Sequence, residues 1–336
     1  MTNLGTLKSK AILSKLIFPI TIVAILIFAH FNPMVHRMSA GIAVISGIIL
    51  SVVFENPYIE KTKIIASKLL AWSVVGLGFG MNLITVAKVG LHGIGYTILS
   101  ILLCTIMGIL LGKWMSNKRD TSVLITFGTA ICGGSAIAAI SPTIKAKHHE
   151  ISVALAIVFL LNAVSLFVFP SVGHALKLTQ SQFGLWSALA IHDTSSVVGA
   201  TLQYGAQALD VGTTVKLARA LWIVPITFIL GSIYSRYIFN KAEHGEMGPV
   251  KKPWFILGFL GAAALVTWVP VLKAPGLFIR DISEQALIVT LFCIGANLSR
   301  SAIKSVGVKP FIQGLILWIL MASITLFAIY FKFISL

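Results

Sequence analysis

Residues 151 to 169 read ISVALAIVFLLNAVSLFVF, a stretch without a charged side chain and without alternation of polar and apolar positions. At about 1.5 Å per residue, an α-helix of this length can cross most of the roughly 30 Å hydrocarbon core of a bilayer. Strands of a membrane β-barrel alternate lipid-facing and lumen-facing residues, and this stretch does not. It therefore predicts a transmembrane α-helix.

Similar apolar runs recur along the whole chain, which has 336 residues and is 57% hydrophobic and only 11% charged. A soluble domain does not carry this balance. We predict an all-α polytopic membrane protein, with residues 1 to 336 in a single transporter domain of about nine full transmembrane helices plus two re-entrant or broken segments. The eleven apolar segments are 11 to 29, 38 to 54, 64 to 87, 91 to 112, 121 to 141, 150 to 170, 183 to 204, 214 to 235, 254 to 272, 283 to 299 and 308 to 331.

The net charge of +16 comes from basic residues that gather in short clusters at the ends of these segments. Such clusters keep loops in the cytoplasm, so they indicate control of topology rather than binding of nucleic acid. We expect a multi-pass protein of the bacterial inner membrane, with the N-terminus in the cytoplasm and the C-terminus outside. The first apolar run lacks a convincing cleavage site and is interpreted as a signal anchor.

Two short patterns recur within the chain. AICGGSAI at 130 to 137 is echoed by AIHDTSSV at 190 to 197, and GMNL at 80 to 83 by GANL at 295 to 298. If segments 121 to 141 and 183 to 204 are re-entrant and enter from opposite sides, the echoed elements form an inverted-topology repeat. We therefore expect a first repeat at 38 to 170 and a second, inverted repeat at 183 to 333, with circular permutation as an added assumption. Full broken spans remain the alternative.

Asp193 is the one acidic residue of ten that lies in the middle of an apolar segment. A charged side chain at this depth costs about 2.5 to 3.5 kcal/mol on insertion scales, so Asp193 must face protein, water or an ion. We expect Asp193 or His192 to bind the coupling ion, H+ or Na+. The alternative is a hydrogen-bonded residue that shapes a helix break.

The substrate site is expected where two interrupted helices meet. Adjacent glycines permit an unwound backbone, and the N-terminal ends of half-helices direct free N–H groups at an anion. Packing of small residues is the alternative explanation for the glycines. The residues expected to bind substrate are Cys132, Gly133, Gly134, Ser135, His192, Asp193, Thr194, Ser195, Ser196, Arg219, Asn82 and Asn297.

Arg219 follows Lys216 by three residues, so a helix places both cations on one face. The guanidinium could bind an oxyanion bidentately or pair with Asp193, and snorkelling to the membrane surface is the alternative. Asn82 and Asn297 could supply amides to the site or hold helices together.

Enzyme signatures such as HExxH, GxSxG and GxxxxGK do not occur in the chain. The three cysteines, Cys104, Cys132 and Cys293, have no CxxC spacing, and we expect neither an enzyme, a cofactor nor a metal site. Two alternatives to a transporter remain open. One is an anion channel, and the other is a membrane enzyme or sensor that uses His192, Asp193 and Ser195 as a catalytic cluster.

Four strings carry a family resemblance: GTAICGGSAIAAISP at 128 to 142, ALAIHDTSSVVGATLQYG at 188 to 205, KLARALWIVP at 216 to 225 and GFGMNL at 78 to 83. Over nearly its whole length the chain resembles the sulfate exporter family of conserved bacterial inner-membrane proteins. The resemblance implies secondary active export of sulfate or a related sulfur oxyanion or organosulfonate.

More distantly, the order of the motifs in the first half is similar to that of bile-acid:sodium symporter-like carriers, in which discontinuous helices cross near the midplane between inverted repeats. The second half departs from that order, so the sodium ligands of those carriers are not transferred. The expected partners are a small anion, H+ or Na+ and the lipid bilayer, but no nucleic acid. A homodimer is one alternative for the oligomeric state.

Overall fold

The computed structural model describes residues 15–27, 33–238, 254–297 and 306–335, and within these ranges every regular element is a helix. The all-α prediction is therefore confirmed for the described chain. A short helix, Lys15–Ile27, comes first. The other helices are α2 (Pro33–Phe54), α3 (Ile59–Gly78), α4 (Leu83–Trp114), α5 (Arg119–Ala130), α6 (Gly134–Thr143), α7 (His148–Ala175), α8 (Gln180–Ala190), α9 (Thr194–Tyr204), α10 (Ala206–Ala220), α11 (Ile223–Ile238), α12 (Trp254–Trp268), the 3-10 turn η1 (Pro270–Leu272), α13 (Lys273–Ala296) and α15 (Val308–Tyr330).

Several of these helices are suited to a bilayer. Among the described residues, four are long and apolar enough to cross a membrane, or up to six if each of two bent pairs forms one span. The four are Gly93–Trp114, His149–Ala175, Ala206–Tyr234 and Val308–Tyr330. The count of about nine full spans stays a prediction.

The predicted segment 64 to 87 is not one helix. α3 ends at Gly78, α4 begins at Leu83, and the two axes are bent by 110°. The side chain of Asn82 accepts hydrogen bonds from the first turn of α4, and the Leu83 amide donates to Thr267 Oγ1 of α12 at 2.8 Å. Because the free N–H groups of a helix start are satisfied in this way, the apolar run can break there.

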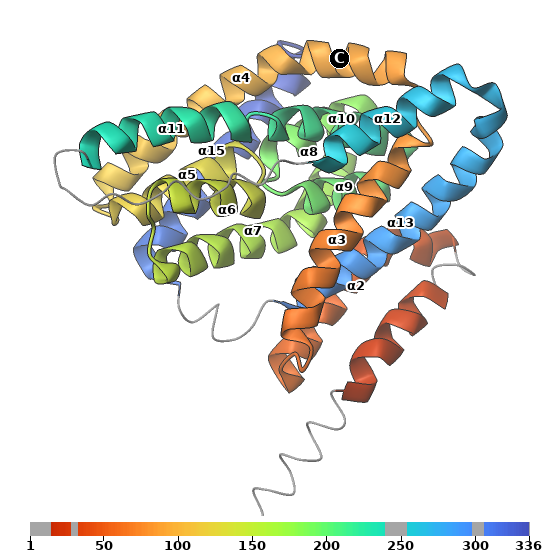
Figure 1. Ribbon diagram of the computed structural model, residues 1–336, viewed down its shortest axis with the longest axis horizontal. Coiled ribbons are helices and arrows are strands. Elements are labelled where there is room, and N and C mark those ends of the chain that lie inside the picture. Colours follow the sequence, from red (N-terminus) through yellow and green to blue (C-terminus); the bar gives the residue numbers. More distant parts are fainter. Residues whose placement is uncertain (1–14, 28–32, 239–253, 298–305, 336) are drawn as a thin grey trace, which may run out of the picture.

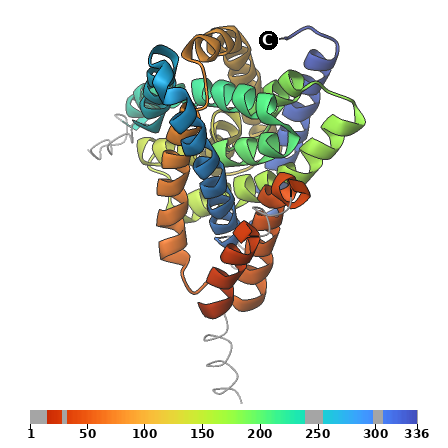
Figure 2. The same ribbon diagram turned by 90° about the vertical axis from the view of Figure 1, so that its right-hand side faces the viewer.

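The helices pack as two bodies that lie side by side (Figures 1 and 2). One body, which we call the panel, contains α2, α3, α12 and α13, and α13 contacts both α2 and α3. The other, which we call the core, contains α4 to α11 and α15. Contacts between the bodies run mainly from α2 and α13 of the panel to α9 of the core.

Two interrupted helices occupy the interior of the core. α5 is followed closely by α6, α8 is followed closely by α9, and α7 and α10 pack against them. Each half-helix is short, 10 to 12 residues, so none of them spans a bilayer alone. α8 is buried from Phe183 to Ala190, and α9 from Thr194 to Thr201. The C-terminal ends of α5 and α8 and the start of α9 are therefore buried within the protein.

Candidate functional site

The first interruption lies at residues 131 to 133, between α5 and α6. Gly133 adopts a φ of +66° and a ψ of −126°, a conformation that residues with a side chain rarely adopt. A Cβ atom added to Gly133 would lie 3.1 Å from the Cβ atom of Asp193 and 3.3 Å from its Cα atom. Glycine is therefore needed here for its conformation and for the close approach of the second interruption.

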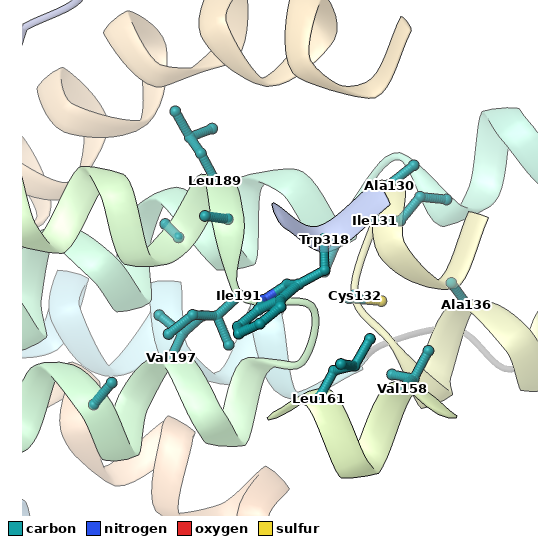
Figure 3. Close-up of a cluster of buried hydrophobic side chains, with 14 of the residues drawn as sticks. Ala130, Ile131, Cys132, Ala136, Val158, Leu161, Leu189, Ile191, Val197 and Trp318 are labelled. Carbon is teal, nitrogen blue, oxygen red and sulfur yellow. The ribbon is translucent and has the colours of Figure 1, made fainter. Parts of the chain in front are cut away.

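The second interruption lies at residues 191 to 193, between α8 and α9. Ile191 and Asp193 have extended backbones, and Asp193 sits at the N-terminal end of α9. Its carboxylate accepts a hydrogen bond from the Ser195 hydroxyl. The two interruptions are sixty positions apart in sequence, yet Gly133 and Asp193 are in contact. We call this place the crossing. Figure 3 shows Cys132 of the first interruption and Ile191 of the second.

Arg219 of α10 ties the end of α5 to the end of α8. Its side chain is fully buried. Nε donates to the carbonyl of Ala130 at 2.7 Å and Nη2 to that of Thr129 at 3.1 Å, both in the last turn of α5. Nη1 donates to the carbonyls of Ala188 at 3.1 Å and Leu189 at 2.5 Å, in the last turn of α8. These carbonyls have no partner within their own helices and carry partial negative charge, so the guanidinium stabilises both helix ends.

Lys216 lies one turn earlier on α10 and is also fully buried. Its Nζ donates to the carbonyl of Ile191 at 2.7 Å and to that of Ala188 at 3.4 Å. In the part of the chain that the structure describes, neither Lys216 nor Arg219 forms an ion pair with Asp193. Both cations therefore act on backbone carbonyls.

The expectations for Arg219 are corrected accordingly. Its full burial is incompatible with snorkelling to the membrane surface, and no ion pair joins it to Asp193 among the described residues. Its donors face four carbonyls, so in this structure the guanidinium is not free to hold an oxyanion bidentately. Arg219 is a positioning residue that holds the half-helices together.

The remaining predicted residues of the two motifs are mostly enclosed at the crossing. Ser135 differs, because its side chain is exposed, and Gly134 beside it is partly exposed. The start of α6 therefore lies outside the buried cluster. Ser135 does not share the buried environment of the hydroxyls of Thr194, Ser195 and Ser196. Besides Gly133 and Asp193, the buried residues of the two motifs include Cys132, His192, Thr194, Ser195 and Ser196.

Asn82 and Asn297 lie away from the crossing. Asn82 is exposed and caps α4, with Oδ1 accepting from the amide of Ile84 at 2.8 Å. Asn297 ends α13, and its Oδ1 accepts from Thr62 Oγ1 of α3 at 2.6 Å. Both side chains thus bond at helix ends in this structure, and their expected role in binding substrate stays a prediction.

Asn162 of α7 is a site residue that the sequence interpretation missed. Its side chain is 2% exposed, and its Oδ1 accepts from the backbone amide of His192 at 3.2 Å. Between Ile151 and Phe169 it is the one residue with a side-chain amide or a charge. That isolated amide in an apolar helix was the available signal.

The crossing carries a surplus of positive charge. Two buried cations, Lys216 and Arg219, face one buried carboxylate, Asp193. If each half-helix end carries about half an elementary charge, the two positive N-terminal ends offset the two negative C-terminal ends, and a net charge of about +1 remains. Within the described ranges, no group of three or more His, Cys, Asp and Glu side chains could hold a metal ion. The arrangement favours attraction of an anion.

Comparison with known proteins identifies a family. The model of the family described as Conserved hypothetical protein 698 matches residues 13–314. The UPF0324 membrane protein Bd1437 of Bdellovibrio bacteriovorus is 57% identical over 321 residues, covering 96% of this chain and 95% of the relative. The UPF0324 membrane protein of Porphyromonas gingivalis is 44% identical over 328 residues, covering 95% of this chain and 97% of the relative.

The UPF0324 membrane protein GSU2818 of Geobacter sulfurreducens is 47% identical over 287 residues, which cover 85% of this chain and 89% of the relative. No solved structure matches the chain. The names of these relatives identify membrane proteins and state no substrate. The chain is a membrane protein that belongs to the family described as Conserved hypothetical protein 698, whose relatives are named UPF0324 membrane proteins.

Proposed function

We propose that this protein is a secondary active transporter that moves a small anion across the membrane by alternating access. The observation that carries the proposal is the contact between Gly133 and Asp193, where two interrupted helices meet in the interior of the core. An irregular backbone at membrane depth is tolerated where it lines a cavity or is buried in protein, and transporters build their sites from such half-helices.

The charge at the crossing supports an anion as the substrate. Lys216 and Arg219 are buried with a single carboxylate nearby, so a bound anion would neutralise the surplus positive charge. The resemblance to the sulfate exporter family favours sulfate or a related sulfur oxyanion or organosulfonate, moved outward across the inner membrane. Asp193 is the candidate for coupling to H+ or Na+, because loss of its charge would strengthen attraction of the anion.

The division into panel and core supports alternating access. The contacts between the bodies include the ion pair between Arg280 of α13 and Asp210 of α10 and the packing of Gly199 of α9 against Leu291 of α13. Because the helices pack most extensively within their own body, we expect the core to shift against the panel while keeping its own packing. The cytoplasmic N-terminus, the external C-terminus, about nine spans and the inverted repeats belong to the same proposal.

The catalytic alternative is less favoured by the side-chain geometry. A Ser-His-Asp relay needs the imidazole between the hydroxyl and the carboxylate. Here the Ser195 hydroxyl donates directly to Asp193, and neither ring nitrogen of His192 has a hydrogen-bond partner in the part of the chain that the structure describes. This arrangement supports a binding role for the cluster.

A flux assay in proteoliposomes tests the proposal. Radiolabelled sulfate uptake is measured for the wild type, Asp193→Asn and Ser195→Ala, and saturation and counterflow distinguish a carrier from a channel. We expect both variants to lose most of the flux. The matched controls are Asp281→Asn and Ser171→Ala, which change the same chemical groups at exposed positions. Wild-type flux in both site variants would place the transport site elsewhere.

A further inference from the structure

Two side chains at the crossing hold polar atoms that have no hydrogen-bond partner within the described residues. These atoms are Nδ2 of Asn162 and both ring nitrogens, Nδ1 and Nε2, of His192. The side chains are 2% and 1% exposed. A buried polar group without a partner is costly, and such groups are rare in native proteins. Arg219, in the same interior, makes four hydrogen bonds, whereas the Asn162 and His192 atoms remain available for a ligand.

The orientation of the Asn162 amide is fixed by its surroundings. The backbone N–H of His192 is a donor, so the Asn162 atom that meets it at 3.2 Å must be the carbonyl oxygen. The amide nitrogen then lies on the other branch of the side chain, with two N–H donors that no acceptor in the described protein receives. The oxygen of the Asn162 side chain thus binds the backbone of His192, while its nitrogen keeps two N–H donors available for a ligand.

The surroundings add further groups that can donate hydrogen bonds. The hydroxyls of Thr129 and Ser187, in the last turns of α5 and α8, are buried, have no partner among the described residues, and can donate or accept. The indole Nε1 of Trp318, which can only donate, is unpartnered as well, and Figure 3 shows Trp318 in the same side-chain cluster as Ile191 and Leu161. The Asp193 carboxylate already accepts from Ser195. The Asn162 amide nitrogen and the Trp318 indole can only donate, so a ligand with acceptor oxygens would satisfy them, whereas a bare metal cation would not.

We propose that Asn162 and His192 bind the transported molecule directly, and that this molecule is a small oxyanion whose oxygens accept from the Asn162 amide and from a ring N–H of His192. This inference rests on the proposed function and deepens it, because it names two ligands and a chemical class. Arg219 and Lys216 hold the helix ends around the anion without touching it.

Binding of sulfate to purified full-length protein tests this inference. The dissociation constant is measured by isothermal titration with sodium sulfate, against sodium chloride at matched ionic strength. Asn162→Asp keeps an oxygen for the His192 amide but replaces the donors with an acceptor. We expect its dissociation constant to rise at least tenfold, which corresponds to about 1.4 kcal/mol. His192→Phe, which removes both ring nitrogens, should weaken binding to a similar extent.

The matched control is Asn82→Asp, because aspartate caps a helix as well as asparagine does and Asn82 is exposed. Sulfate affinity should not change in this variant. If a site variant does not fold, the position of a bound anion in the wild-type protein still tests the inference. Crystals soaked with selenate, an anomalously scattering analogue of sulfate, should show a peak within hydrogen-bond distance of Asn162 Nδ2.

The outcomes separate the two proposals. Wild-type affinity in both Asn162→Asp and His192→Phe, or a selenate peak away from Asn162, overturns this inference and leaves the transporter proposal standing. A wild-type protein that binds no sulfate or selenate overturns the oxyanion class here and the anion substrate proposed above. Weakened binding in both variants with a selenate peak at Asn162 supports the assignment.

Discussion

The helices of the panel and those of the core are held together by different means. In the panel, glycine residues allow the backbones of neighbouring helices to come into contact. A Cβ atom added to Gly47 of α2 would collide with the carbonyl oxygen of Phe292 and lie 2.7 Å from the amide of Ala296, both on α13. The contact is reciprocal, since Gly295 of α13 lies against the carbonyl of Val44. No charge is needed there, because each helix satisfies its own backbone at the point of contact.

The interior of the core contains helix ends, and the last backbone carbonyls of a helix need hydrogen-bond donors from outside that helix. The last carbonyls of α5 and α8 are buried and receive hydrogen bonds from Arg219 and Lys216 of α10. The comparison shows that buried cations here follow from interrupted helices. Whole helices pack by shape, whereas the buried ends of interrupted helices need partners that carry charge, and these ends place polar groups where a small ligand can bind.

The largest effect is expected from Arg219→Leu. This change removes a donor from four buried carbonyls, of which that of Ala188 keeps Lys216 as a second donor. Each buried group left unpaired costs about 1 to 3 kcal/mol, and the sum approaches the total stability of a typical domain. We expect no monodisperse protein in detergent by size-exclusion chromatography. Lys63→Leu, at a lysine whose side chain is 54% exposed, is the control and should behave as wild type. Normal chromatographic behaviour of Arg219→Leu would contradict the role given to α10.

Gly133→Ala should have the next largest effect. The added methyl group would meet Asp193, and the positive φ would cost about 1 to 3 kcal/mol of strain. We expect a lower melting temperature and loss of sulfate flux. Gly134→Ala is the matched control, because its methyl group meets movable side chains, the ring of Phe159 at 3.0 Å and Leu155 Cδ2 at 3.5 Å. Equal behaviour of the two variants would show that the close approach at the crossing is unimportant.

Gly47→Ala tests the packing of the panel. The methyl group would press against the backbone of α13, and overpacking of this kind costs about 1 to 3 kcal/mol. We expect a lower melting temperature with unchanged affinity for sulfate, since the crossing lies in the core. Gly90→Ala in α4 is the control, as nothing lies within 4 Å of its added methyl group. A loss of affinity in Gly47→Ala would mean that the two bodies are not independent.

The smallest effect on stability is expected from removal of the ion pair that joins the panel to the core. Arg280 contacts Asp210 of the core at 3.3 Å and Glu284 of its own helix at 3.0 Å, with the Asp210 side chain 35% exposed. Arg280→Gln should change stability by about 1 kcal/mol or less, because solvent screens the pair. If the bodies move during transport, the flux should change by about fivefold or less. Glu60→Gln, which breaks an exposed pair within α3, should leave the flux unchanged.

The sequence was informative where the cause is local. Continuous apolar runs predicted helices, and the echoed motifs predicted interruptions near Gly133 and Asp193, because helix length and helix breaking depend on neighbouring residues. The same reasoning placed Lys216 and Arg219 on one helix face. It failed at Asn82, where a helix break inside the run 64 to 87 looked like continuous hydrophobic sequence.

Only the tertiary structure decided which groups meet. Arg219 reaches Ala130, 89 residues away, and Asn162 reaches His192, 30 residues away, and nothing in the local sequence fixes either contact. Ser135 is likewise left exposed by the way α6 packs, although its motif resembles that of Ser195. The sequence by itself determined that helices would break and that charge would be buried beside them. The fold determined the partners, because a hydrogen bond depends on distance in space and not on spacing along the chain.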